Sequence, residues 1–365
     1  MPTITDHLDA HGAESFEELP FGEADNYVVC KLVNPNFTGV LEEAGESVLI
    51  GEAFDRLYAL RGEEAEAMGA LASPHLMPVL RRLPETVRFR DLRLSGYVRR
   101  IRPDKTEQFS ALTVHLPNGR KYVAFRGTDD TLLGWKENFL MAVQLHVEAQ
   151  KDAAAYLLSA AEQWEGPLLA GGHSKGGNLA VYAAALVPEE AQERILGVYN
   201  FDGPGFLPEF YTEPGYLRLR PRVRTYLPRH SLVGTLLTRE KWASVVECRT
   251  AFAAAHDGFT WEVKEDASFL RAARLSRSSR AFEETMDQVL ERLSLEERRQ
   301  FIEELFDALS STGAVTLTDL TENRLSQAIG IAGSFRRGTG TRRFVLLVLG
   351  QLLKSLAAQS LGLDS

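Results

Sequence analysis

Cysteine is scarce in this sequence, and basic residues are in the minority. Cys30 and Cys248 are the two cysteines among 365 residues, and they form neither a metal-binding spacing nor a disulfide framework. Lys and Arg number 41 against 50 Asp and Glu, which gives a net charge of −9 at pH 7. The cysteine spacing therefore gives no reason to expect a metal site. Because nucleic-acid binding requires broad positive charge to neutralise phosphates, we also expect no nucleic-acid partner.

A long apolar run is also missing from the beginning of the sequence. Residues 1–16 are polar and acidic, and they lack the apolar core of a Sec-type signal peptide. This absence predicts a cytoplasmic protein. The composition, with 44% hydrophobic and 25% charged residues, is typical of a globular protein that buries a substantial core.

The most informative stretch is residues 172–176, which read Gly-His-Ser-Lys-Gly. A short apolar run precedes it, and an Ala- and Leu-rich run follows it, so the order predicts strand, sharp turn and helix. This is the context of a G-x-S-x-G nucleophile elbow, with Ser174 exposed at the turn. Gly172 and Gly176 lack a Cβ and would let the strand and the helix approach closely. The alternative is a glycine-rich turn that carries an ordinary serine.

The surrounding segments predict an α/β repeat. Two strand-like runs, 109–116 and 121–125, flank Asn118-Gly119, a strong hairpin signal. The run at 121–125, the expected helix at 147–164, the nucleophile strand and the helix after it give strand, helix, strand and helix in turn. The other expected elements are strands at 87–101, 195–201, 223–227 and 245–248, a helical stretch at 52–83 that is broken at Pro74 and Pro78, and either a helix or a strand at 28–33.

The C-terminal part has helical spacing throughout, so we divide the chain into residues 1–275 and a helical region 276–365 packed on them. The helices expected there are 282–293, 295–309 with a capping box at Ser294 and Glu297, 317–331, and the unusually apolar 344–361. The last helix is too short to span a membrane. It would pack against the body of the protein or a second copy of the chain in a homo-oligomer, or lie on a membrane surface behind basic residues.

A serine hydrolase needs a nucleophile, a base, a carboxylate that orients the base, and donors for the oxyanion. In the α/β-hydrolase fold these groups follow the order Ser, acid, His. The sequence has Ser174, then Asp202 at a strand end, then His256 in a late loop. Asp257 directly follows His256, and neighbours in an extended loop point apart. We therefore predict that Asp202 contacts His256 and that Asp257 faces away.

Several of these motifs are shared with known families. The run Phe125-Arg-Gly-Thr128, Trp135 and the serine motif resemble class 3 lipases. The full set is more similar to the Mbeg1-like family of bacterial lipase-related α/β-hydrolases; it adds Asp129-Asp130, residues 134–137, 202–206 and 256–261, and the N-terminal 20–26. The resemblance implies an α/β-hydrolase fold with a mostly parallel sheet.

The resemblance also implies oxyanion donors. These would be Thr128, through its backbone N–H with or without its hydroxyl, and the backbone N–H of Lys175. One position departs from the lipases: their acid follows a later strand, and the matching residues 228–233 contain no carboxylate.

We interpret the sequence as a serine esterase or lipase that needs no cofactor and acts on a small acyl ester or a lipid. Ser174 would be the nucleophile, His256 the base and Asp202 the acid. The missing lipase acid favours one alternative, a non-catalytic scaffold used for binding. A second alternative keeps the chemistry in a thioesterase or an acyltransferase. The sequence leaves open whether residues 131–150 form a lid.

Overall fold

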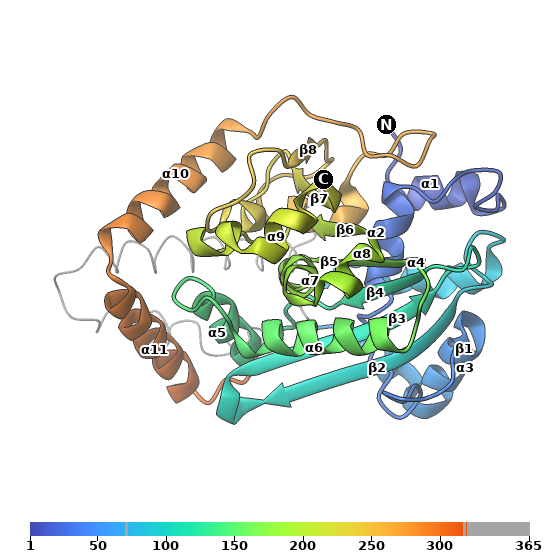
Figure 1. Ribbon diagram of the computed structural model, residues 1–365, viewed down its shortest axis with the longest axis horizontal. Coiled ribbons are helices and arrows are strands. Elements are labelled where there is room, and N and C mark those ends of the chain that lie inside the picture. Colours follow the sequence, from blue (N-terminus) through green and yellow to red (C-terminus); the bar gives the residue numbers. More distant parts are fainter. Residues whose placement is uncertain (70–71, 317–318, 320–365) are drawn as a thin grey trace.

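A single eight-stranded sheet runs through the molecule (Figure 1). The structure is a computed structural model and describes residues 1–69, 72–316 and 319. The strands are β1 (Val48–Leu49), β2 (Arg93–Arg102), β3 (Glu107–His115), β4 (Lys121–Phe125), β5 (Leu168–His173), β6 (Ile195–Phe201), β7 (Val223–Pro228) and β8 (Ser244–Val246).

The strands lie side by side in the order in which they occur in the sequence. β1 to β4 pair antiparallel, and β3 and β4 form the hairpin that Asn118-Gly119 predicts. β4 to β8 pair parallel, so their carboxyl ends meet at one edge of the sheet. The sheet, its helical covers and the strand–turn–helix after β5 make an α/β-hydrolase fold, as expected.

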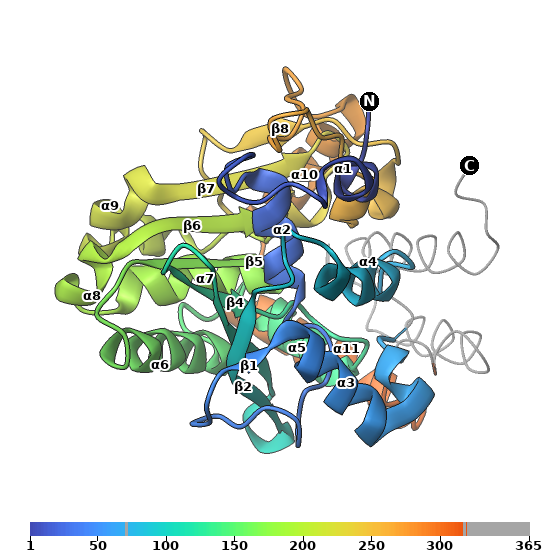
Figure 2. The same cartoon turned by 90° about the vertical axis from the view of Figure 1, so that its right-hand side faces the viewer.

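The helices are α1 (Ile4–His11), α2 (Glu23–Lys31), α3 (Ile50–Arg61), α4 (Leu76–Arg82), α5 (Leu132–Leu140), α6 (Glu148–Glu162), α7 (Lys175–Leu186), α8 (Glu189–Glu193), α9 (Pro214–Leu219), α10 (Arg277–Arg292) and α11 (Leu295–Ser311). The sheet separates two groups of these helices, α6 and α7 on one face and α2 and α4 on the other (Figure 2).

Alternation along β4 shows how the strands fill both layers. Tyr122 and Ala124 belong to the core that contains α2, α3 and α4, while Val123 and Phe125 belong to the core that contains α6 and α7. Because successive side chains of a strand point to opposite faces, a strand that is buried on both faces is apolar at every position. The apolar run at 122–125 meets this requirement.

Two sequence expectations are settled in the N-terminal part. Residues 28–31 belong to a helix, since α2 runs to Lys31, and β2 begins at Arg93 rather than at residue 87. A buried ion pair fixes α2: both oxygens of Asp25 accept from Arg88, from Nε and Nη2, at 2.6 Å each. Asp25 also accepts from the backbone N–H of Gly22 at 2.8 Å, which caps the helix. Short-range periodicity could not reveal this pairing.

The C-terminal helices α10 and α11 lie on one side of the sheet (Figure 1). α10 begins at Arg277 with Ser276 as its N-cap, next to the expected boundary at 275 and 276. α11 has the expected capping box of Ser294 and Glu297, and it packs against α5 through Phe301, Leu305 and Phe306. The helices expected at 317–331 and 344–361 lie outside the described residues. Within the described ranges, the structure has no helix of sufficient length and apolarity to span a membrane.

Candidate active site

Ser174 occupies a strained turn between β5 and α7. Its backbone angles are φ 59° and ψ −134°, a region that side-chain-bearing residues rarely adopt. The turn is held from both sides, because Ser174 N–H donates to the carbonyl of Phe201 on β6 at 2.9 Å and Gly177 N–H donates back to the Ser174 carbonyl at 2.9 Å. The geometry is that of the predicted elbow, which presents a side chain at the carboxyl edge of the sheet.

Gly172 and Gly176 allow the close packing that the elbow requires. A Cβ on Gly176 would lie 2.1 Å from the carbonyl oxygen of Phe125 on β4. A Cβ on Gly172 would lie 2.3 Å from the carbonyl carbon of Gly176. Non-bonded atoms cannot approach this closely, so β4, β5 and α7 can meet here only where both residues lack a side chain.

Asp202 contacts His256, as predicted. The carboxylate lies in a turn after β6, is fully buried, and places Oδ2 2.6 Å from His256 Nδ1. Its Oδ1 accepts from Ser231 Oγ at 2.5 Å and from Gly234 N–H at 3.1 Å. Segment 228–233, which lacks the carboxylate of the lipase pattern, thus supplies a donor to a carboxylate carried by the preceding strand.

Asp257 faces away from His256, also as predicted. Its Oδ2 accepts from Ser73 Oγ at 2.5 Å, and its Oδ1 accepts from Phe259 N–H at 3.1 Å. Asp202 is therefore the carboxylate positioned to orient the His256 ring. Since it engages Nδ1, the proton of the neutral imidazole belongs on Nδ1, and Nε2 is left as the acceptor.

His173, the residue before Ser174, packs against His256 and bonds its backbone. Its Nε2 donates to the backbone carbonyl of His256 at 2.6 Å, and the two rings lie 4.3 Å apart. Its Nδ1 lies 3.4 Å from Lys31 Nζ, which acts as donor. Burial, with smaller effects from Lys31 and His256, holds the pKa of His173 well below its usual value. His173 is thus a neutral positioning residue.

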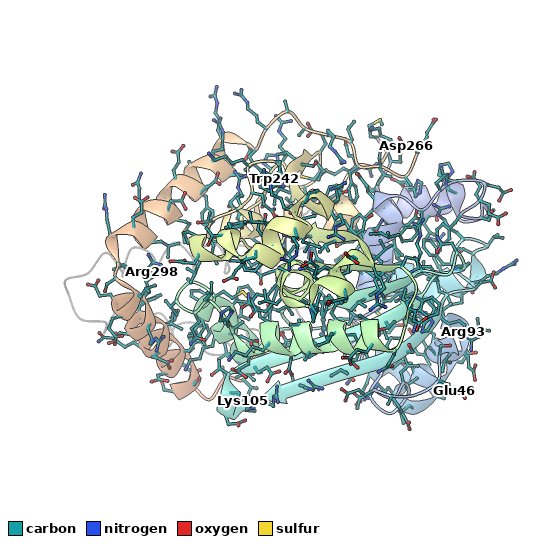
Figure 3. All side chains as sticks on the ribbon, viewed as in Figure 1. Glu46, Arg93, Lys105, Trp242, Asp266 and Arg298 are labelled. Carbon is teal, nitrogen blue, oxygen red and sulfur yellow. The ribbon has the colours of Figure 1, made fainter. Side chains whose placement is uncertain are left out.

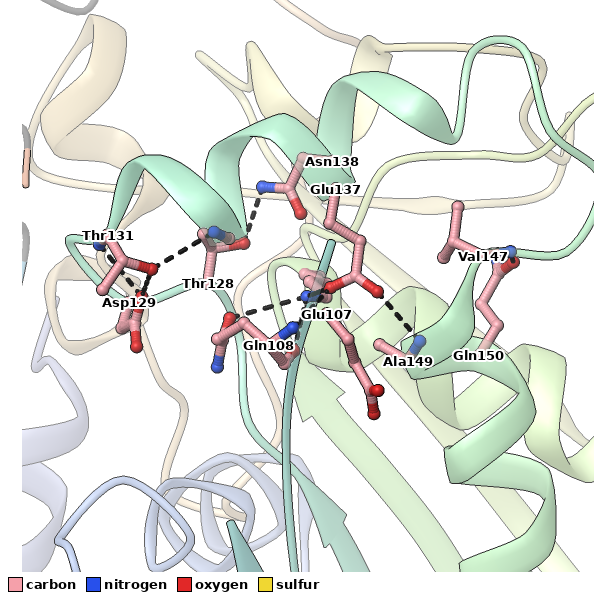
Figure 4. Close-up of polar contacts among 12 residues, drawn as sticks. Glu107, Gln108, Thr128, Asp129, Thr131, Glu137, Asn138, Val147, Ala149 and Gln150 are labelled. Atoms are coloured by element: carbon pink, nitrogen blue, oxygen red, sulfur yellow. Dashed lines mark hydrogen bonds and ion pairs between the residues drawn. The ribbon is translucent and has the colours of Figure 1, made fainter. Parts of the chain in front are cut away.

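Thr128 lies beside the elbow, on the loop after β4. The neighbouring Gly127 packs so closely on the turn that a Cβ there would lie 3.3 Å from Ser174 Cβ. Thr128 Oγ1 accepts from Asn138 Nδ2 at 2.6 Å (Figure 4). Because that bond uses a lone pair of the hydroxyl, the Thr128 O–H remains able to donate into the adjacent cavity.

Lys175 begins α7, so its backbone N–H has no carbonyl partner within the helix. Its side chain is a feature that the sequence analysis missed. The Nζ forms a completely buried ion pair with Glu137 Oε2 at 2.5 Å and donates to the Gln108 carbonyl at 2.7 Å. Glu137 also accepts from the N–H groups of Gln108 and Ala149, at 3.0 and 2.9 Å (Figure 4). The ion pair therefore ties the start of α7 to α5.

A cavity of about 310 Å³ opens at Ser174, with His256 and Thr128 in its lining. Much of the remaining lining is apolar and comes from α5, α10, α11 and the loop after β7. These residues are Trp135, Phe139, Leu232, Val233, Leu236, Leu237, Phe282, Met286, Leu290, Phe301 and Ile302. These helices are predictable from the sequence, but their place over Ser174 is not, because amphipathic spacing shows which face of a helix is buried and not which element covers that face.

Comparisons with known proteins identify a family. A family model described as Mbeg1-like matches residues 83–307. Among curated proteins, none matches this chain.

Solved structures similar to this chain include M37 lipase, at 14% identity and a TM-score of 0.35, covering 50% of this chain and 69% of that one. The propeptide complex of Rhizomucor miehei lipase in its native form is similar at 12% identity and a TM-score of 0.32. This match covers 57% of this chain and 73% of that one. A deletion mutant of the same complex is similar at 15% identity and a TM-score of 0.31. This match covers 43% of this chain and 56% of the mutant chain, so it spans less than two thirds of that chain's length.

Asp202→Asn should reduce turnover of p-nitrophenyl butyrate by about 10⁴-fold, because an amide stabilises the wrong His256 tautomer. Asp257→Asn is the matched control and should lower kcat by less than about tenfold, because Asp257 bonds Ser73 and not the ring. The measurement is kcat for both variants after circular dichroism has confirmed their fold. Equal losses would contradict the assignment of the acid.

Glu137→Gln should destabilise the fold by about 3–5 kcal/mol, because it leaves the Lys175 charge buried without a partner. The double variant Glu137→Gln with Lys175→Met removes both charges and should recover most of that loss. Urea unfolding of the two single variants and the double variant gives the coupling energy. Simple addition of the two single effects would show that the pair is not coupled.

Proposed function

The chain belongs to the Mbeg1-like family, and from this premise we propose that it is a serine hydrolase that cleaves acyl esters. Ser174 is the nucleophile, His256 the general base and Asp202 the residue that orients it. The observation that carries the proposal is the 2.6 Å bond between Asp202 Oδ2 and His256 Nδ1, because the same histidine lines one cavity with a strained serine. These are the three roles that acyl transfer by a serine requires.

In the first half of the reaction, Ser174 Oγ attacks the carbonyl carbon of the ester while His256 Nε2 takes the serine proton. The π electrons of the carbonyl move to its oxygen, and the backbone N–H groups of Thr128 and Lys175 donate to that oxyanion. The intermediate then collapses. The bond to the alcohol oxygen breaks, the alcohol takes the proton from His256, and the acyl group remains on Ser174.

In the second half, water replaces the alcohol. His256 removes one proton from water as its oxygen attacks the acyl carbon, and the bond to Ser174 Oγ breaks as that oxygen regains a proton. The products are a carboxylic acid and the free enzyme. Asp202 keeps its negative charge throughout and stabilises the imidazolium that forms twice in the cycle.

The apolar lining supports a hydrocarbon acyl group in the part of the cavity that α5, α10 and α11 form. Side chains of α5, α10 and α11 offer a largely apolar wall to a hydrocarbon chain. The rival interpretation, a non-catalytic binding scaffold, rests on the missing carboxylate at 228–233. Asp202 provides a carboxylate to His256 from another strand, which weakens that argument.

Ser174→Ala should lower the turnover of p-nitrophenyl butyrate by several orders of magnitude, because the nucleophile is lost. It should also abolish labelling by a fluorophosphonate probe, which reacts with activated serines. Ser159→Ala, at an exposed position of α6, is the matched control and should change neither result. Undiminished turnover by Ser174→Ala would refute the proposed function.

Met286→Trp should select against long acyl chains, because Met286 is a buried residue of α10 that lines the cavity. We expect kcat/KM for p-nitrophenyl decanoate to fall by about tenfold or more relative to p-nitrophenyl acetate, since the larger ring fills space that the chain needs. Leu295→Trp adds the same ring at an exposed position of α11 and serves as control. An equal change for both esters would place the acyl chain elsewhere.

A further inference from the structure

Two cationic side chains in the lining of the active-site cavity have neither a carboxylate nor a backbone carbonyl as partner among the described residues. A third, Arg298, donates to the carbonyls of Leu290, Leu293 and Ala142. Lys31 and Arg126 both line the cavity that contains Ser174 and His256. In residues 1–69, 72–316 and 319, neither cation takes part in an ion pair. Cations that are withdrawn from water and left unpaired are unfavourable in a folded protein, so such a pair calls for an anion.

Lys31 is the last residue of α2 and is only 7% exposed. Its Nζ lies 3.4 Å from His173 Nδ1 and 5.7 Å from the centre of the Tyr27 ring. Burial lowers the pKa of Lys31, and the nearby Arg126 charge lowers it further, while Asp257 acts in the opposite direction. The ammonium group of Lys31 thus contacts the residue that directly precedes Ser174 in the chain.

Arg126 follows β4 and precedes Gly127, which packs on Ser174. Its backbone N–H donates to the Ser110 carbonyl at 3.0 Å, which fixes the main chain at this point. Its guanidinium group is half-buried and makes no hydrogen bond within the described part of the chain. The five donors of that group are therefore available to a ligand.

The carboxylates of the same cavity are engaged elsewhere. Asp129 Oδ1 accepts from the N–H and the hydroxyl of Thr131, at 3.0 and 2.5 Å. Asp257 accepts from Ser73 and Phe259. Asp130 also lines the cavity and is buried. Neither Asp129 nor Asp257 forms an ion pair with Lys31 or Arg126 in the described part of the chain.

We propose that Lys31 and Arg126 form a subsite for an anionic group, phosphate or carboxylate, on the alcohol part of the substrate. The inference rests on the proposed function for the position of the ester at Ser174. The cavity then has two unlike ends. In Figure 1, α10 and α11, which carry the apolar wall, lie on one side of β5, and α2, which ends at Lys31, lies on the other. A substrate that matches both ends is a single-chain amphiphile with an anionic head group.

The test compares two lipids with the same acyl chain, lysophosphatidylglycerol, which carries a phosphate anion on its alcohol part, and monoacylglycerol, which carries no charge. We expect kcat/KM of the wild-type protein to favour the anionic lipid at least about tenfold, the effect of one charge-assisted hydrogen bond. The double variant Lys31→Gln with Arg126→Gln should bring this ratio close to one. Succinate and inorganic phosphate, added as competitors, should show which anion the subsite prefers.

A matched control removes two positive charges outside the cavity. Arg99→Gln with Lys105→Gln changes exposed residues on and near β2, with Lys105 at the tip of the β2–β3 hairpin (Figure 3), and should keep the wild-type ratio. A ratio close to one in the wild-type protein, or an unchanged ratio in the Lys31 and Arg126 variant, would overturn the subsite. So would turnover of p-nitrophenyl butyrate without turnover of either lipid.

Binding measurements on Ser174→Ala separate this inference from the proposed function. Calorimetry should show tighter binding of lysophosphatidylglycerol than of monoacylglycerol, and the difference should vanish when Lys31→Gln and Arg126→Gln are added. That outcome supports the subsite even if no hydrolysis is found. Equal binding of the two lipids by Ser174→Ala overturns the subsite and leaves the proposed hydrolysis to its own test.

Discussion

The arrangement of the site depends on a steric constraint, the absence of room for any Cβ where β4, β5 and α7 meet. Gly172 and Gly176 remove the side chains that would collide there, and the backbone of Ser174 takes up the resulting sharp turn at φ 59°. The same close approach brings Gly127 against Ser174, and with it the loop that carries Thr128. The serine, the Thr128 loop and the N-terminus of α7 are thus placed by one packing requirement rather than by separate interactions.

The carboxylate that contacts His256 is carried by the end of β6, although the end of β7 lies at the same edge of the sheet. Parallel strands end at one edge of a sheet, so carboxylates after β6 and after β7 can both approach a histidine above that edge. Here β6 supplies Asp202, which has a left-handed backbone at φ 52°, and the loop after β7 supplies Ser231 and Gly234 as donors to it. A buried carboxylate is stable when its lone pairs accept hydrogen bonds, and those donors meet this need.

The sequence predicts the parts of the fold that local patterns determine. The Asn118-Gly119 hairpin, the elbow glycines and the capping box at Ser294 each depend on residues within a few positions, and all three are present. The Asp202–His256 contact was also predictable, because both residues follow elements that meet at one edge of the sheet. The ion pair of Lys175 with Glu137 was not, since a lysine beside the nucleophile is solvent-exposed unless tertiary packing buries it.

What sequence could not supply is the combination of distant elements around Ser174. Lys31 ends a helix at one end of the chain, Arg126 ends a strand, and Met286 lies in α10, yet all three line one cavity. The α/β core places the reacting groups, and the cavity takes its remaining walls from α2 on one side and α10 and α11 on the other (Figure 1). Lys31 also bonds His173, whose Nε2 bonds the backbone carbonyl of His256, so a single imidazole connects Lys31 to the main chain that carries His256. The position of the Lys31 ammonium group and the position of the His256 backbone therefore depend on the same buried imidazole.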